Sequence, residues 1–310
     1  MTRFYRFMLN FGIFVALACF FIAPPTYSLS TSDTGIIEGD LFKLGVEKMQ
    51  HGSYFEAIQD FTKVINLKHD FSSAYSNRCL AYLELGNYHN AIDDCNQALK
   101  YTPNNVETHL NRGLAYYRQG DYEAAIADDN QVIALTPHDF RAYYNRGIAH
   151  GMLGNHQQAI LDYNLAITNI PQSSSFLKAD VYNDRGLAHF ELSDLKAAML
   201  DFSQAIELND NDYRAYYNRG CACGGSGDNS CAVRDFTESL KLNPTNAMAY
   251  LNRGIAYHQL GREQAAITDL RKAILHFTEQ RETTIYEKAL FLLKNLQQQL
   301  SSLSDIAFIN

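Results

Sequence analysis

The sequence has 310 residues, of which 46% are hydrophobic and 19% are charged, so it can bury the core of one large domain or two ordinary ones. Its formal net charge is −8, and Lys and Arg form no run anywhere in it. Because nucleic-acid binding needs a basic surface that neutralises phosphates, this composition argues against a nucleic-acid partner.

Residues 1–28 have the layout of a secretory signal. Two arginines precede an apolar stretch, residues 7–23, which two prolines and a Ser/Thr-rich segment follow. The pattern predicts export with cleavage after Ser28, although the stretch is nearly long enough to stay as a membrane anchor, and Cys19 weakly suggests lipoprotein processing. We therefore expect the body in the periplasm or on the extracytoplasmic face of the membrane, and in contact with the membrane only through this segment if it is not cleaved.

A repeat begins after a predicted linker, residues 29–37. Pro103, Pro137 and Pro171 are 34 residues apart, and the dipeptide Arg-Gly recurs with the same period. One interval between these dipeptides is 39 residues, which places a five-residue insertion at about 174–178. The predicted units are 38–71, 72–105, 106–139, 140–173, 179–212, 213–246 and 247–280.

Each unit is predicted to form two short amphipathic helices. In the fourth unit the first helix carries Tyr143 and Gly147 on one face and ends at Gly154, since Gly tolerates the left-handed conformation that ends a helix. The second helix carries a stripe that includes Ala159 and ends before Pro171, which cannot continue a helix.

A terminal helix is predicted after the last unit. Residues 281–300 contain one apolar stripe backed by polar side chains, as the cap of a solenoid requires. Residues 301–310 are predicted to be a loose tail.

This pattern resembles the tetratricopeptide repeat family, over residues 38–280. In the fourth unit the match consists of Tyr143, Gly147, Gly154, Ala159, Tyr163, Ala166 and Pro171. The resemblance implies an all-α, right-handed superhelical solenoid of about seven antiparallel helix pairs with a C-terminal capping helix. It also implies that the chain binds a protein or peptide.

By the same resemblance, the first helix of each unit lines the concave face. The outward positions there are apolar and rich in Tyr, and Tyr and Arg are favoured where partners dock. The alternative is that about half of them are core between units. The candidate partner-binding residues are Leu80, Leu83, Leu114, Tyr117, Arg118, Tyr144, Ile148, Met152, Phe190 and Tyr217.

Recurring Arg and Asp residues predict a series of ion pairs along the solenoid, with a continuous charged binding strip as the alternative. One unit breaks the pattern, because Asp129 stands where four other units have an aromatic ring. A carboxylate at an apolar site is costly unless it is paired. We expect His109 or His150 to pair with it; an exposed groove edge and an acid–base or metal site are the alternatives.

Five cysteines follow residue 28, so an oxidising compartment would leave one unpaired. Cys79 and Cys95 are predicted to be small buried hydrophobes. In the sixth unit, a disulfide is predicted from Cys231 to either Cys221 or Cys223. The same three thiols support the alternative function, a thiol- or metal-dependent redox protein.

The sequence contains none of the common catalytic motifs, such as a phosphate-binding loop or a nucleophile elbow. We therefore expect no enzymatic activity, no catalytic residue, no bound metal and no cofactor. The function predicted from the sequence is that of an exported scaffold or assembly factor that holds a partner protein or peptide on its concave face.

Overall fold

The computed structural model describes residues 33–280 and 283–307, and this part of the chain is helical throughout, with no strand. The fifteen helices are α1 (Asp33–Gln50), α2 (Tyr54–Leu67), α3 (Ser72–Glu84), α4 (Tyr88–Tyr101), α5 (Val106–Gln119), α6 (Tyr122–Leu135), α7 (Phe140–Met152), α8 (His156–Asn169), α9 (Ser175–Glu191), α10 (Leu195–Leu208), α11 (Tyr213–Gly225), α12 (Asn229–Leu242), α13 (Ala247–Gln259), α14 (Glu263–Gln280) and α15 (Thr283–Ala307).

The corner between the two helices of each unit has a fixed construction. A residue with positive φ follows the first helix, and this residue is a glycine in six of the seven units. In the fifth unit it is Ser193, with a φ of 62°. At several corners an Asn or Asp side chain then caps the second helix, as when Asp121 accepts a hydrogen bond from the amide of Ala124.

The two helices of a unit pack closely where a glycine faces an aromatic ring. A Cβ added at Gly147 would lie 2.7 Å from Cε1 of Tyr163, so only Gly fits there. Gly45, Gly186 and Gly220 meet a phenylalanine ring of their own unit in the same way. This close approach explains why the Gly and the ring recur together in the sequence.

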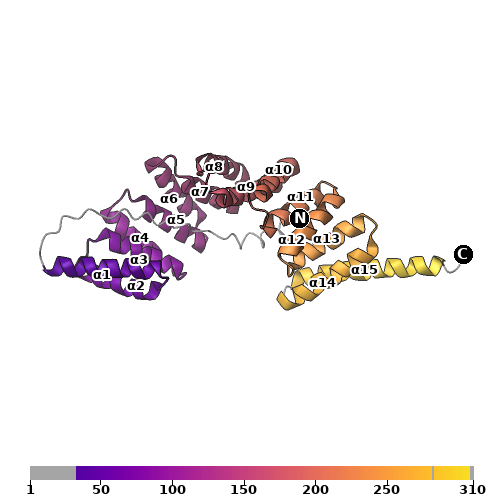
Figure 1. The fold of residues 1–310 in the computed structure, drawn as a ribbon, viewed down its shortest axis with the longest axis horizontal. Helices are drawn as coiled ribbons and strands as arrows, with labels where there is room; N and C mark the ends of the chain where they lie inside the picture. The colour runs from indigo at the N-terminus through magenta and orange to yellow at the C-terminus, as the bar shows by residue number, and fades with distance from the viewer. Residues whose placement is uncertain (1–32, 281–282, 308–310) are drawn as a thin grey trace.

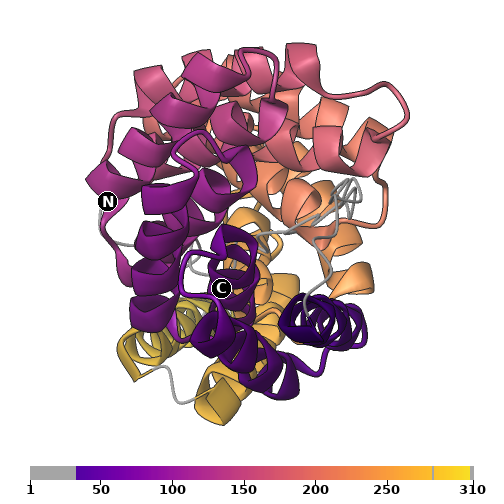
Figure 2. The ribbon, with the colours of Figure 1, turned by 90° about the vertical axis from the view of Figure 1, so that its left-hand side faces the viewer.

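The units form an arch (Figure 1), and from its end they wind around a common axis (Figure 2). Consecutive first helices contact one another, from α1 with α3 to α11 with α13, whereas no two second helices in the described residues pack comparably. In a curved stack of helix pairs, the helices on the inner side are closer to one another than those on the outer side. The first helices therefore line the concave side, and α5, α7 and α9 lie beneath α6, α8 and α10 in Figure 1.

The insertion near 174–178 lies mostly within a helix, because α9 begins at Ser175 and takes it up as an additional helical turn. Two segments differ from the prediction. The predicted linker 29–37 is partly helical, since α1 begins at Asp33, and the predicted tail 301–310 is helical as far as Ala307.

No helix in the described residues is long and apolar enough to cross a membrane. The predicted signal or anchor, residues 1–28, lies outside them.

Candidate functional site

The predicted ion-pair series is present and runs through six units. In the fourth unit Arg146 donates from Nε and Nη2 to both oxygens of Asp162, at 2.9 and 2.5 Å. Its third nitrogen reaches Asn130 of the preceding unit at 2.6 Å. The same arrangement links Arg78, Arg112, Arg185, Arg219 and Arg253 to Asp94, Asp128, Asp201, Asp235 and Asp269.

The aspartates of this series are buried rather than exposed, so a partner cannot reach them. Each arginine joins both helices of its own unit to the second helix of the unit before it. A buried pair of this kind is strongly destabilised when one partner is removed, because the other charge is left without compensation. The series therefore has a structural role, and the candidate binding site is the concave surface.

The concave surface contains most of the predicted partner-binding residues. Leu80, Leu114, Tyr117, Tyr144, Ile148, Met152 and Phe190 are partly exposed there, and Arg118 is exposed. Leu83 and Tyr217 are instead buried, with Tyr217 only 4% exposed, because they pack between helices. These two residues support the surface and offer little area to a partner.

Polar side chains link consecutive first helices along this surface. Ser76 of α3 meets Thr108 of α5 at 2.7 Å, and Tyr144 of α7 donates to Asp184 of α9 at 2.8 Å. Asn218 of α11 donates to Asn183 at 3.0 Å, and Asn252 of α13 donates to the hydroxyl of Tyr217 at 2.9 Å. The corresponding positions on α5 and α7 form no such bond, since the position on α5 is the apolar Leu110; these two helices are joined instead by Arg141 and Glu107 at the edge of the surface.

Two asparagine side chains on this surface take part in no such link. Asn111 and Asn145 occupy the positions of Asn218 and Asn252 in their own units, yet neither amide has a hydrogen-bond partner in the described part of the chain. Both side chains are partly exposed. Each amide can donate and accept a hydrogen bond, which is what an extended peptide backbone requires of its receptor.

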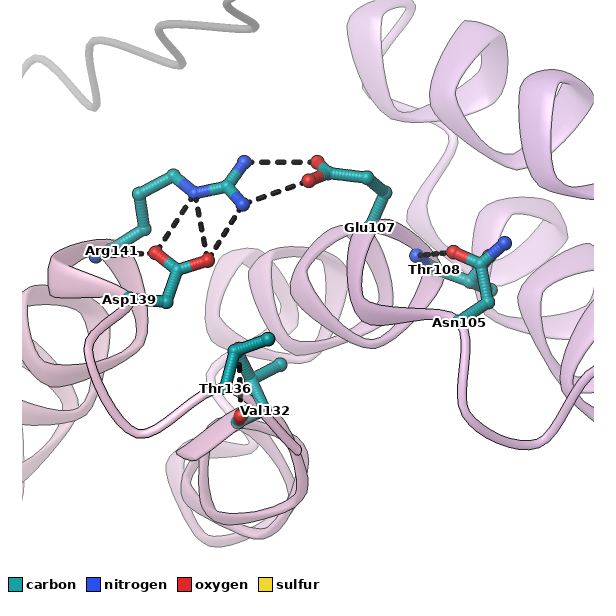
Figure 3. A network of polar contacts seen from close by, with 7 residues as sticks. All are labelled: Asn105, Glu107, Thr108, Val132, Thr136, Asp139 and Arg141. Atoms are coloured by element: carbon teal, nitrogen blue, oxygen red, sulfur yellow. Dashed lines mark hydrogen bonds and ion pairs between the residues drawn. The ribbon is translucent and has the colours of Figure 1, made fainter. Parts of the chain in front are cut away.

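An arginine network lies at one edge of the surface that α5 and α7 form. Arg141 of α7 makes two hydrogen bonds to Glu107 of α5, at 2.8 and 2.9 Å, and three to Asp139, which caps its own helix (Figure 3). Arg214 of α11 repeats the arrangement with Asp180 and Asp212. In each network two carboxylates surround one guanidinium, so the edge keeps a net negative charge.

Asp129 does not have the partner that the sequence analysis gave it. Its side chain is 2% exposed, and its Oδ1 has no hydrogen-bond partner. The Nδ1 atom of His109 instead lies 2.8 Å from Oδ1 of Asp128, and Nδ1 of His150 is also buried without a partner. The prediction of a satisfied polar cluster is therefore wrong. Burial raises the pKa of Asp129 well above its usual value.

The cysteines form two disulfides. Cys79 is bonded to Cys95, so the prediction that both are isolated small hydrophobes is wrong. These two residues replace the glycine and the ring that face each other in other units, and this double replacement was the signal for a bond. Cys223 is bonded to Cys231, one of the two predicted pairings, and Cys221 is unbridged.

The sixth unit also holds the one group of potential metal ligands among the described residues. The ligand atoms of Cys223, Cys231 and Asp235 lie within 4.8 Å of one another. However, the two sulfurs are bonded to each other, and Asp235 already binds Arg219. Burial raises the pKa of the Cys221 thiol to about 12, which disfavours the thiolate that disulfide exchange requires.

Known protein families and structures match this architecture. Tetratricopeptide repeat models match residues 80–120, 115–154, 140–173, 179–212, 213–246 and 236–268. Among curated proteins, none matches the sequence.

Solved structures share the fold at low identity. A tetratricopeptide repeat protein from Parabacteroides merdae is 18% identical with a TM-score of 0.61, over 84% of this chain and 99% of that one. YrrB, a TPR protein with an unusual peptide-binding site, is 21% identical with a TM-score of 0.53, over 64% and 97%. PilF of Pseudomonas aeruginosa is 16% identical with a TM-score of 0.59, over 70% and 95%. Identities this low support the fold alone; together with the family models, they show that the chain belongs to the tetratricopeptide repeat family.

Proposed function

We propose that the chain is an exported scaffold or assembly factor whose concave face holds an extended segment of a partner protein. The observation that carries this proposal is the pair of unpartnered amides, Asn111 and Asn145, on consecutive first helices. The equivalent Asn218 and Asn252 tie neighbouring units together, and Asn77 bonds to its own helix, whereas these two amides are available to a ligand.

Apolar side chains flank the two amides. Leu80, Leu114 and Ile148 are partly exposed on α3, α5 and α7 and would contact the side chains of a bound segment. An extended peptide binds through its main-chain hydrogen bonds and gains specificity from the contacts of alternate side chains. The concave surface of the second to fourth units offers both kinds of contact.

Export is supported by the cysteines as well as by the sequence of residues 1–28. Four of the cysteines form disulfides, and disulfides persist mainly in oxidising compartments such as the bacterial periplasm. We therefore place the scaffold outside the cytoplasm, where residues 7–23 would anchor it to the membrane if they are retained.

The redox alternative has less support. Its proposed centre contains a disulfide beside a thiol, Cys221, which stays protonated at neutral pH because burial raises its pKa to about 12. Cys231→Ser distinguishes the two functions. If the chain is a scaffold, this change leaves partner binding intact, whereas a redox protein would lose thiol exchange.

A pull-down from the exported fraction tests the scaffold function. The bait is the full chain, compared with an Asn111→Ala/Asn145→Ala double variant. The matched control is Gln97→Ala/Gln131→Ala, which removes two exposed amides from the second helices α4 and α6. We expect one protein to be retained by the wild type and the control and lost from the double variant, with or without reductant. Equal retention by all three baits would contradict the proposed site.

A further inference from the structure

Three tyrosines gather around one carboxylate on the concave side of units three to five. We call them the tyrosine–aspartate cluster: Tyr117 of α5, Tyr144 of α7, Tyr163 of α8 and Asp184 of α9. The hydroxyl of Tyr144 donates to Asp184 at 2.8 Å, and the rings of Tyr144 and Tyr163 are tilted, with centroids 6.1 Å apart. Burial raises the pKa of Tyr163, and the charge of Asp184 adds to this shift; burial and the neighbouring Tyr122 raise the pKa of Tyr117, to which Asp184 adds a smaller part.

Asp184 breaks the repeat at a position where the other units from the second onward have asparagine. Those asparagines are Asn77, Asn111, Asn145, Asn218 and Asn252. Asn252 makes the equivalent contact in the next pair of units, because it hydrogen-bonds to the hydroxyl of Tyr217 at 2.9 Å. A neutral amide therefore serves to link a tyrosine to the next helix. The negative charge at Asp184 is not needed for that link.

No cation of the described chain pairs with Asp184. The nearby guanidinium of Arg214 is bonded to Asp180 and Asp212 instead. Burial, with the charge of Asp180 adding to it, raises the pKa of Asp184 to about 6, so the group is still mostly ionised at neutral pH. A partly buried carboxylate that has only a phenol as its partner is costly, and a cation brought by a ligand would offset that cost.

Tyr163 supplies a second hydrogen-bonding group. The residue is 4% exposed and its hydroxyl makes no hydrogen bond within the described residues, but this oxygen is not fully buried, so a bound side chain can reach it. A donor on such a side chain would bond to this hydroxyl as well as to Asp184.

We propose that the tyrosine–aspartate cluster binds a basic side chain, Lys or Arg, of the partner segment. Aromatic rings attract cations over their faces, and the carboxylate adds a charge-assisted hydrogen bond. The net charge of −8 favours a basic partner in the same way. This inference rests on the proposed function, because it assigns a specificity to the segment that the concave face holds.

Peptide selection tests the inference. Random dodecapeptides displayed on phage are selected on the immobilised full chain and, in parallel, on Asp184→Asn, which keeps a hydrogen-bonding group beside Tyr144. The matched control is Asp210→Asn, which makes the same change of charge at an exposed turn. Melting of each variant, followed by circular dichroism, shows that it is folded.

We expect the peptides selected on the wild type to share a Lys or Arg at one position. Replacing that residue by Gln should weaken binding at least tenfold to the wild type and to Asp210→Asn, and hardly at all to Asp184→Asn. Selected peptides without a basic residue, or equal affinity of the basic peptide for Asp184→Asn, would overturn the inference and leave the scaffold function standing. If no peptide prefers the wild type to Asn111→Ala/Asn145→Ala, both proposals are contradicted.

Discussion

The Asp129→Phe variant should be more stable than the wild type. Units with an aromatic ring at this position pack it against a glycine, and the third unit keeps that glycine, Gly113, although the ring is absent. Asp129 is 2% exposed with an unpartnered oxygen. The substitution therefore restores a ring to a place that the backbone still accommodates, and it removes an unsatisfied carboxyl group.

The expected gain is about 2 kcal/mol in the free energy of unfolding. Removing a buried unsatisfied polar group is worth about 1–3 kcal/mol, and burying a phenylalanine adds about 1.5–3 kcal/mol. Neighbours that have closed around the smaller Asp must move to admit the ring, at a cost of about 1–3 kcal/mol. For a chain of this size, the net gain corresponds to an increase of about 4–8 °C in Tm.

The gain should also depend on pH. Because burial raises the pKa of Asp129 in the folded chain, the folded state keeps its proton at pH values where the unfolded state, with a pKa of about 3.9, has lost it. The wild type therefore loses stability as the pH rises from about 4 toward the folded-state pKa. The Phe variant does not titrate here, so its advantage should grow over the same range.

Urea and thermal unfolding, followed by circular dichroism at pH 4.5, 6 and 7.5, measures both effects. Asp129→Ala is the control, since it removes the carboxyl group without filling the space. Its gain should be smaller than that of Asp129→Phe but should grow with pH in the same way. A Phe variant less stable than the wild type, or an advantage that is constant with pH, would refute the reasoning.

Three further predictions concern the helix contacts, a disulfide and the concave face. Gly147→Leu should destabilise the fold by about 1–3 kcal/mol or more, because its Cβ would meet Tyr163 at 2.7 Å; an unchanged Tm would contradict the packing described. Cys79→Ala/Cys95→Ala should cost about 3 kcal/mol, since the bond closes a loop of 16 residues, and a chain equally stable after the change or after reduction would argue against the bond. Binding of a basic peptide should weaken as the pH falls below about 6, where Asp184 gains a proton and loses its charge; titration calorimetry checks this, and Asp184→Asn should abolish the pH dependence.

The repeat could be predicted from the sequence because its signals are local. Period, glycine and proline positions and apolar stripes all recur with the same spacing, and each acts within one helix or one turn. The Arg–Asp series followed from the same regularity. The extent of the terminal segments did not, since α15 continues to Ala307 although residues 301–310 were predicted to be a tail.

The errors in the candidate site have three separate causes. Cys79 and Cys95 were considered one at a time, although the facing glycine and ring of other units show that the two residues meet. The pairing of His109 with Asp128 rather than Asp129 depends on the directions in which these two adjacent side chains project from α6. The burial of Leu83 and Tyr217 depends on how closely neighbouring units pack, which helical periodicity does not specify.

The cluster around Asp184 was missed for a different reason. Asp184 was recognisable in the sequence as the one acidic residue in a column of asparagines. That it lies beside tyrosines from three other helices depends on the superhelical curvature, which brings α5, α7, α8 and α9 to one place.

Site-specific photo-crosslinking in living cells tests most directly whether the concave face holds a partner. A benzoylphenylalanine is placed at Leu114 or Ile148 on the first helices, and at Gln97 or Gln131 on the second helices as the control. The account predicts that both concave positions crosslink to the same protein and that the control positions do not. Crosslinks to a partner from the second helices alone would contradict a concave binding site and with it the function proposed for this chain.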